Sequence, residues 1–301
     1  MHVNAIERFR SLVSELQPGV LRVCSAEGPL EGFAGAEATD RFKMASIRKL
    51  IVALLFGLME ERGLVHRSTR LRRFGLSDIR PMEDFSLEAT MLQLLGCMSG
   101  VRHPAVGDPE TDGDARSEQP SQTPGTSWRY SNWDFNVLSM ILDRCYPGGI
   151  AAAYQDLLAT PLGLSASIDV VKCYAAPHIS LFPAQQFHLR MEELERIGLM
   201  LAQGGLFSGR RIISKAWIDE CSMPRSPTGA AGLQALYGLG CYAARDGSAL
   251  LSWGFGGQIL LVLPATQRVM VSLMYTHRAA ARRLAAAEVA ALAEAAWLAF
   301  G

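Results

Sequence analysis

The sequence predicts an α+β fold in which an antiparallel sheet from both chain ends is flanked by helices and carries an inserted all-helical domain. Strand-like stretches occur near the N-terminus, at 20–24, and again beyond residue 237. Between them, apolar residues recur at the spacing of helices. Because the strands lie at the two ends, we expect a discontinuous α/β domain over 1–75 and 230–301. A helical domain would span 76–229.

The N-terminal elements follow from spacing and turn residues. Apolar residues at helical spacing over 4–17 stop at Pro18-Gly19, and a strand is expected at 20–24 with a second around Phe33. The stretch 42–63 reads as a helix closed by Gly63. Its apolar run, 50–59, is about half of what spans a bilayer, so we expect a buried helix and no membrane partner.

Helices fill the middle of the chain. Ser86 is a candidate cap for one of them, and others are expected at 132–145, 150–159, 191–203 and 214–221. Residues 102–127 are instead rich in Pro, Gly, Asp, Ser and Thr and show no periodicity. A loop of this length is usually functional or disordered, so we expect it to border the active site.

The C-terminal part changes to strands. They are expected at 237–243, 249–253, 258–263 and 268–275, and Pro264-Ala265-Thr266-Gln267 suits a hairpin turn between the last two. An alanine-rich helix is expected over 279–300.

Composition excludes several classes of function. Lys and Arg number 29, as do Asp and Glu, so no charge excess indicates nucleic acid or an anionic membrane as partner. The first 19 residues are charged and lack an apolar signal-peptide core, which favours the cytoplasm. The six Cys and six His show no zinc-site spacing, so no metal is expected, and no organic cofactor is expected because the sequence has neither G-x-G-x-x-G nor G-x-x-x-x-G-K.

Ser46-Ile47-Arg48-Lys49 forms an S-x-x-K at the start of the apolar helix. Three residues apart, Ser46 and Lys49 share a helix face. A serine hydroxyl becomes a good nucleophile only when a base takes its proton. Lysine can be that base when it is neutral, a state that burial and a nearby cation both favour. Alone, the motif equally suits a capping serine and a solvated lysine.

Two further motifs follow in order. Tyr130-Ser131-Asn132 comes after Pro124-Gly125-Thr126, and Trp253-Gly254-Phe255-Gly256-Gly257-Gln258 leads into a strand. With these, residues 42–275 resemble the serine β-lactamase and penicillin-binding-protein superfamily, closest to its class C and esterase-like branch. The stretches SGVRHPA and SNWDFN look most like 6-aminohexanoate-oligomer hydrolases. The resemblance implies a β-lactamase-like fold.

The resemblance also implies roles for individual residues. Ser46 matches the nucleophile, Lys49 its partner, and Tyr130 the tyrosine that exchanges protons with nucleophile and leaving group. The backbone N–H groups of Ser46 and Phe255 would form the oxyanion hole. The residues expected to line the substrate are Asn132, Trp253, Gly254 and Gly256.

The sequence departs from the family pattern at the third motif, which is usually K-T-G or H-x-G. Ser252-Trp253-Gly254 occupies the matching place and contains no cationic side chain. Anionic β-lactams and D-Ala-D-Ala peptides are therefore not expected as substrates. The sequence predicts a cytoplasmic serine acyl-enzyme hydrolase of a small ester or amide that is not a true β-lactamase. A transacylase that passes the acyl group to an amine or alcohol and a non-catalytic acylation sensor remain alternatives. The oligomeric state stays open.

Overall fold

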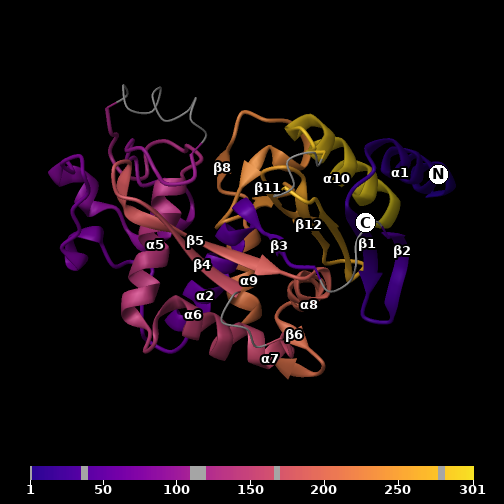
Figure 1. Cartoon of the computed structure of the whole chain (residues 1–301), viewed down its shortest axis with the longest axis horizontal. Helices are drawn as coiled ribbons and strands as arrows, with labels where there is room; N and C mark the ends of the chain where they lie inside the picture. Colours follow the sequence, from indigo (N-terminus) through magenta and orange to yellow (C-terminus); the bar gives the residue numbers. More distant parts are fainter. Residues whose placement is uncertain (1, 35–39, 109–119, 166–169, 277–281) are drawn as a thin grey trace. The chain divides into compact units, whose positions relative to one another are not determined.

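The computed structural model describes residues 2–34, 40–108, 120–165, 170–276 and 282–301 (Figure 1). The chain divides into two compact units. Unit 1 comprises Met1–Leu50, Pro161–Ser165 and Phe187–Gly301, and unit 2 comprises Ile51–Thr160 and Ala166–Gln186. The predicted boundaries at 75/76 and 229/230 differ from these, since 51–75 fall in unit 2 and 187–229 in unit 1. We describe each unit by itself.

Unit 1 is built on an eight-stranded antiparallel sheet to which both chain ends contribute. The strand order is β2-β1-β13-β12-β11-β10-β9-β8. In register, Val20 lies opposite Leu273 and Ile259 opposite Ser272. The predicted α+β fold with an antiparallel sheet is thus confirmed. The strands are β1 Val20–Ser25, β2 Gly28–Ala34, β8 Ser226–Pro227, β9 Leu236–Tyr237, β10 Tyr242–Ala243, β11 Leu250–Gly254, β12 Gln258–Leu263 and β13 Arg268–Leu273.

Helices cover both faces of this sheet. On one face, α1 (His2–Leu16) and α10 (Ala286–Phe300) lie together, and the rings of Phe9 and Phe300 meet edge to face at 5.2 Å. On the other face lies α8 (Met191–Ala202), where a Cβ on Gly198 would come 2.6 Å from Val269. This close packing on β13 explains why residues 187–229 belong with the sheet.

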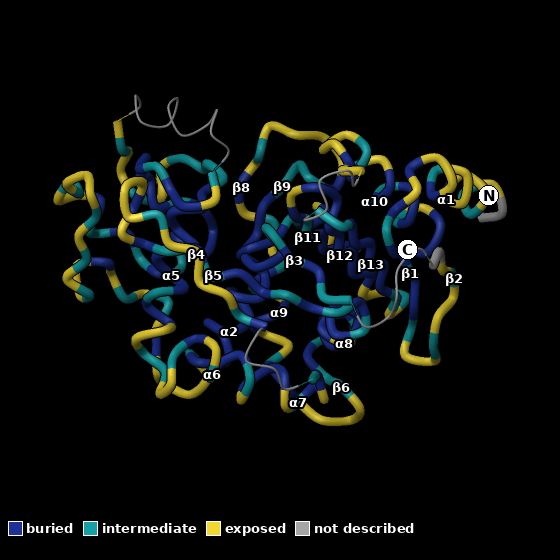
Figure 2. Tube along the Cα trace, in the orientation of Figure 1, coloured by how far each residue is buried: buried dark blue, intermediate teal, exposed yellow. Residues whose placement is uncertain are grey.

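The segment 42–63 contains two short elements before its helix. These are β3 (Phe42–Lys43) and the 3₁₀ turn η1 (Ala45–Ile47), and α2 (Arg48–Glu60) follows. Residues 50–59 are fully buried, as the dark blue trace of α2 in Figure 2 shows. Gly63 ends the helix with a φ of 70°, and Leu64 N donates to Met59 O. This left-handed C-cap is the one that the sequence predicts at Gly63.

Unit 2 contains a hairpin in addition to its helices. β4 (Val171–Ala176) pairs with β5 (Ser180–Leu189), and β5 runs on into unit 1, where Leu189 lies opposite Phe42. Thr90, and not Ser86, caps the predicted helix, because Thr90 and Gln93 form a capping box. The helical elements are η2 Leu71–Phe74, η3 Asp84–Glu88, α3 Met91–Leu95, α5 Asn132–Cys145, α6 Gly149–Tyr154, η4 Gln155–Ala159 (a π-helix) and α7 Thr160–Leu162.

Two predicted elements near the C-terminus differ in detail. The strand expected over 237–243 is split into β9 and β10 by a turn in which Gly238 N donates to Cys241 O at 2.9 Å. The alanine-rich helix begins at Ala286, and 279–281 lie outside the described residues. No described helix is long and apolar enough to cross a membrane. The remaining elements are β6 Leu206–Phe207, β7 Arg210–Arg211, α9 Lys215–Ser222 and η6 Gly232–Gln234.

Candidate active site

Ser46 sits in η1, at the junction between β3 and α2 in unit 1. The backbone enters this turn through Ala45, whose φ of 47° lies in the left-handed region. That conformation costs a residue with a Cβ about 1–2 kcal/mol. Strain of this kind persists where the surrounding structure holds it, which is characteristic of functional sites. Here Met44 fixes the turn, because its N–H donates to Phe187 O at 2.9 Å and its carbonyl accepts from Ile47 N at 3.0 Å.

Lys49 lies one turn further on, in the first turn of α2. Its Nζ donates to Ser46 Oγ at 3.4 Å. The lysine side chain is only 1% exposed, and Ile47 and Leu50 beside it are fully buried. Desolvation disfavours the charged form of a lysine, which is the form that cannot accept a proton. The structure therefore brings a buried amine within reach of the serine hydroxyl, as the S-x-x-K spacing predicts.

Two further cations accompany Lys49. Arg48 is 2% exposed, and Lys43 on β3 is half-buried. Burial, and secondarily the charge of Arg48, lower the pKa of Lys43. The environment around the start of α2 is thus one that disfavours additional positive charge.

The strand β11 approaches the backbone of Ser46 at Gly254. A Cβ on Gly254 would lie 2.6 Å from Met44 O and 2.9 Å from Ser46 N, closer than real Cβ atoms come. Glycine is therefore required for this approach. Phe255 follows at the end of the strand, with its side chain 62% exposed and the Arg283 guanidinium 5.2 Å from its ring centroid. The assignment of the Ser46 and Phe255 N–H groups to an oxyanion hole stays a prediction.

The assignment of Trp253 and Gly256 as substrate contacts stays a prediction. Side chains alternate along β11, so Trp253 points away from the face on which Gly254 meets Ser46. Trp253 packs against the core cluster shared with α1 and α10. Gly256, with a φ of 89°, forms the turn after β11 and accepts from Leu284 N at 3.1 Å. Both residues also contribute to the structure of the sheet.

Ser252 lies on the same side of β11 as Gly254, by the same alternation. It is 2% exposed and brings no charge to this side of the strand. Ser252 thus places a neutral side chain where the family that this sequence resembles has a Lys or His.

Tyr130 belongs to unit 2, where it is half-buried and immediately precedes α5. The residues on either side of it are held in place. Arg129 N donates to Cys97 O at 3.2 Å, and Ser131 caps α5 by accepting from Asp134 N at 3.0 Å. That Tyr130 exchanges a proton with Ser46 stays a prediction.

A buried carboxylate organises the surroundings of Tyr130. Asp134 is fully buried and accepts from Ser99 Oγ at 2.6 Å and from Ser131 Oγ at 3.0 Å. Burial raises the pKa of Asp134 to about 6, although these hydrogen bonds act in the opposite direction. The serine before the helix and the aspartate three residues later are a sequence signal of a capped helix start. The bond to Ser99 has no comparable signal in the sequence.

Asn132 is held by the start of the long loop. Its Nδ2 donates to Asp108 Oδ1 at 2.9 Å and to Gly107 O at 3.1 Å. The loop closes on itself where Gln122 N donates to Gly100 O at 2.9 Å. Residues 109–119 of the predicted loop 102–127 lie outside the described residues. Asn132 thus has protein partners, and its contact with substrate stays a prediction.

Sequence reasoning missed a second buried carboxylate, Asp78. It accepts from Trp133 Nε1 at 2.8 Å and from Leu181 N at 2.8 Å, and it lies 3.6 Å from His103 Nδ1. Burial alone would raise the pKa of Asp78, but the nearby His103 imidazole and the hydrogen bonds from Leu181 and Trp133 hold it well below its usual range. This aspartate joins the start of the long loop to α5 and to β5. Within the described residues, no three His, Cys, Asp or Glu side chains form a potential metal site.

Comparisons with known proteins show what this chain is similar to. A family model described as Beta-lactamase matches residues 25–168, a range that contains Ser46, Lys49 and Tyr130. None of the curated proteins matches the sequence.

Solved structures resemble the chain over most of its length. One, assigned as a 6-aminohexanoate-dimer hydrolase from Bacillus anthracis, is 15% identical with a TM-score of 0.64 over 88% of this chain and 75% of its own. A penicillin-binding protein from Bacillus halodurans is 14% identical with a TM-score of 0.65 over 95% and 98%. A D-stereospecific amidohydrolase from a Streptomyces species is 16% identical with a TM-score of 0.59 over 90% and 93%.

These matches confirm the resemblance to the serine β-lactamase and penicillin-binding-protein superfamily. The fold is β-lactamase-like.

Proposed function

We propose that the protein is a serine hydrolase that cleaves a small ester or amide through an acyl-enzyme on Ser46. The observation that carries this proposal is the placement of buried Lys49, whose Nζ lies 3.4 Å from Ser46 Oγ in a strained turn. The likeness to hydrolases that act on amides, including the 6-aminohexanoate-dimer hydrolase and the D-stereospecific amidohydrolase, supports the same class of reaction.

The proposed reaction has two halves. Neutral Lys49, together with Tyr130, takes the proton of Ser46 Oγ while the oxygen attacks the substrate carbonyl. The resulting oxyanion is held by the backbone N–H groups of Ser46 and Phe255. Tyr130 then returns the proton to the departing alcohol or amine as the C–O or C–N bond breaks. Water adds to the acyl-Ser46 in the same manner, which releases the acid and restores the serine.

The substrate is proposed to be other than a β-lactam or a D-Ala-D-Ala peptide. In the resembling family, a Lys or His on the strand beside the nucleophile binds or polarises the substrate near its carboxylate. Here Ser252 occupies that position and is uncharged and buried. An uncharged acyl group suits this neutral position better.

One experiment tests the proposal. The protein is incubated with a panel of p-nitrophenyl esters, with and without added amines, and products and protein are analysed by mass spectrometry. A hydrolase releases free acid at every amine concentration and forms an adduct on Ser46. A transacylase yields amide in preference to acid, and a sensor stops after one equivalent. Efficient hydrolysis of nitrocefin would contradict the argument from Ser252, and an adduct on a different serine would contradict the nucleophile.

A further inference from the structure

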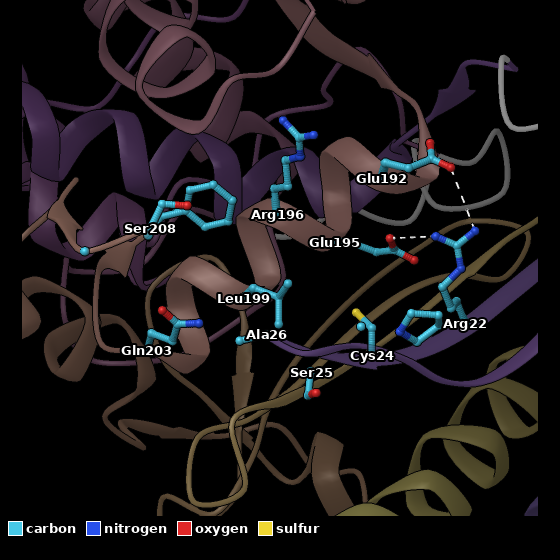
Figure 3. A pocket seen from close by; sticks show the side chains of 14 residues that line it. Arg22, Cys24, Ser25, Ala26, Glu192, Glu195, Arg196, Leu199, Gln203 and Ser208 are labelled. Carbon is cyan, nitrogen blue, oxygen red and sulfur yellow. Dashed lines mark hydrogen bonds and ion pairs between the residues drawn. The ribbon is translucent and has the colours of Figure 1, made fainter.

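A pocket lies in unit 1, and the elements that form it carry none of the proposed catalytic residues. It has a volume of about 500 Å³ and is formed by β1, the turn into β2, α8 and the β6–β7 turn (Figure 3). This volume falls in the range of small-molecule sites. The aliphatic part of the pocket wall is formed by Ala26, Pro29 and Leu199.

Glu195 is a buried acid on the wall of this pocket. It is 7% exposed, and Figure 3 shows its carboxylate turned toward Arg22. One oxygen, Oε2, accepts from Arg22 Nη1 at 3.0 Å. The other, Oε1, is buried and has no hydrogen-bond partner among the described residues. Leaving a buried acceptor unsatisfied costs about 1–3 kcal/mol, so a ligand that donates a hydrogen bond to Oε1, once the carboxyl group turns this oxygen toward the pocket, would be favoured.

The arginines of the pocket are already engaged. Arg22 bridges Glu195 and Glu192, the latter at 3.8 Å, and Arg196 Nη1 donates to the carbonyls of Leu162 and Gly163. An anionic ligand would therefore have to displace an existing partner of a cation. A cationic donor would instead meet an oxygen that lacks one. The charge distribution thus favours an ammonium over a carboxylate or phosphate.

We propose that this pocket is a binding site for a small aliphatic primary amine, whose ammonium group donates to Glu195 Oε1 while its alkyl chain lies along Leu199 and Pro29. A charge-assisted bond of this kind is about twice as strong as a neutral one. The site is separate from the S-x-x-K chemistry and does not depend on the proposed reaction.

The protonation of Glu195 gives the proposal a distinctive signature. Burial, partly offset by Arg22, raises the pKa of Glu195 to about 7. The other charged or titratable groups that face it are Glu192 and Arg196 from α8 and Cys24 from β1. An ammonium placed against the carboxylate favours its ionised form. Binding near pH 7 should therefore release a fraction of a proton per amine.

The test is isothermal titration calorimetry of the full chain with n-hexylamine, with n-hexanol and hexanoate as probes of equal alkyl length. We expect hexylamine to bind with a dissociation constant on the order of 1 mM. Hexanoate should bind at least about tenfold more weakly, because its carboxylate has no hydrogen to donate to Glu195 Oε1 and repels the ionised Glu195 side chain. Titrations in buffers of different ionisation enthalpy at pH 7 measure the released protons. Hexanol should release none.

Variants locate the binding. Glu195→Gln keeps the shape of the side chain and should weaken hexylamine binding about tenfold and abolish proton release. Leu199→Trp should abolish binding by filling the pocket. Glu192→Gln, on the same helix but partly exposed, is the matched control and should change the affinity less than about twofold.

Three results would overturn the proposal. They are no hexylamine binding by the wild-type protein at 10 mM, about ten times the expected dissociation constant, equal binding by wild type and Glu195→Gln, and binding without proton release. Because Glu195→Gln is nearly isosteric, it carries the test even when Leu199→Trp fails to fold.

Discussion

Ser46 in unit 1 and Tyr130 in unit 2 are held in place by different kinds of interaction. Around Ser46 the backbone itself is constrained, through the left-handed Ala45 and the contact with Gly254, and the neighbouring helix is apolar. Around Tyr130 the chain is held by side-chain hydrogen bonds that converge on the buried Asp134.

Each half of the proposed site is therefore sensitive to a different kind of change. Backbone approach and apolar burial do not titrate, so the conformation of the turn that carries Ser46 should tolerate changes of pH but not added volume. A buried carboxylate does titrate, so the surroundings of Tyr130 should respond to pH. Substitutions in both units test this contrast.

The largest effect is expected for Ser46→Ala. Removing the nucleophile should lower kcat/KM for a p-nitrophenyl ester by about 10⁴-fold or more and prevent adduct formation. The exposed Ser14→Ala is the control and should behave as wild type. The Ser46→Ala variant should lose turnover while its circular dichroism spectrum stays that of the wild type. An active Ser46→Ala enzyme would end the assignment.

Lys49→Arg should lower kcat/KM by about 10²- to 10⁴-fold, because an arginine stays protonated and cannot serve as base. Lys43→Arg is the matched control, since Lys43 is also partly buried and lies close by in the sequence. Activity in Lys49→Arg near that of wild type would show that Lys49 is not the base.

The same assay tests whether Tyr130 and Lys49 act together. Tyr130→Phe should cost as much as one acid–base group supplies, about 10²- to 10⁴-fold. If Tyr130 and Lys49 act as one unit, the double variant Lys49→Ala/Tyr130→Phe should lose little more than either single variant. Strictly additive losses would mean that the two residues act independently.

Asp134 should make stability depend on pH. Its pKa of about 6 lies above the ordinary value of 3.8, so the folded protein holds the proton more tightly than the unfolded chain. This contribution, about 3 kcal/mol, is present below about pH 4 and is lost as the pH rises through about 6. Asp134→Asn should therefore reduce the change in unfolding free energy between pH 4 and pH 7, measured by urea denaturation. The surface variant Asp219→Asn should retain the wild-type change.

Gly254→Ala tests the backbone approach to Ser46. The added Cβ would press on Met44 O and Ser46 N, so the turn that carries the nucleophile must move. A shift of this size should lower kcat by about 10- to 100-fold. Gly32→Ala on β2 is the matched control, since its nearest neighbour would be Leu21 O at 4.0 Å. Equal kcat values for the two variants would refute the role of the contact.

These contrasts explain what the sequence could predict. The period of apolar residues gave the bounds of α5, Asn132–Cys145, and of β12, Gln258–Leu263, because packing on one face sets both patterns. The S-x-x-K spacing likewise predicted the proximity of Ser46 and Lys49, since a helix turn fixes it.

Other features depend on contacts between distant residues, which no local pattern records. The Asp78 contacts to Trp133 and Leu181 span 55 and 103 positions. The orientation of Trp253 required knowing which face of β11 meets η1. Residues that are adjacent in a sequence motif need not share a site, because the side chains of consecutive residues in a strand point to opposite faces of the sheet.

The pairing of β1 with β13 has a consequence for biosynthesis. Val20 lies opposite Leu273, so the partners are separated by most of the chain. At about 5–20 residues per second, a ribosome takes roughly 10–50 s to deliver the second strand after the first. During that interval one edge of β1 has no partner strand, and an unpaired edge invites pairing with other chains. A nascent-chain chaperone that binds short apolar segments would therefore be most useful to this protein while residues 20–25 wait for 268–273.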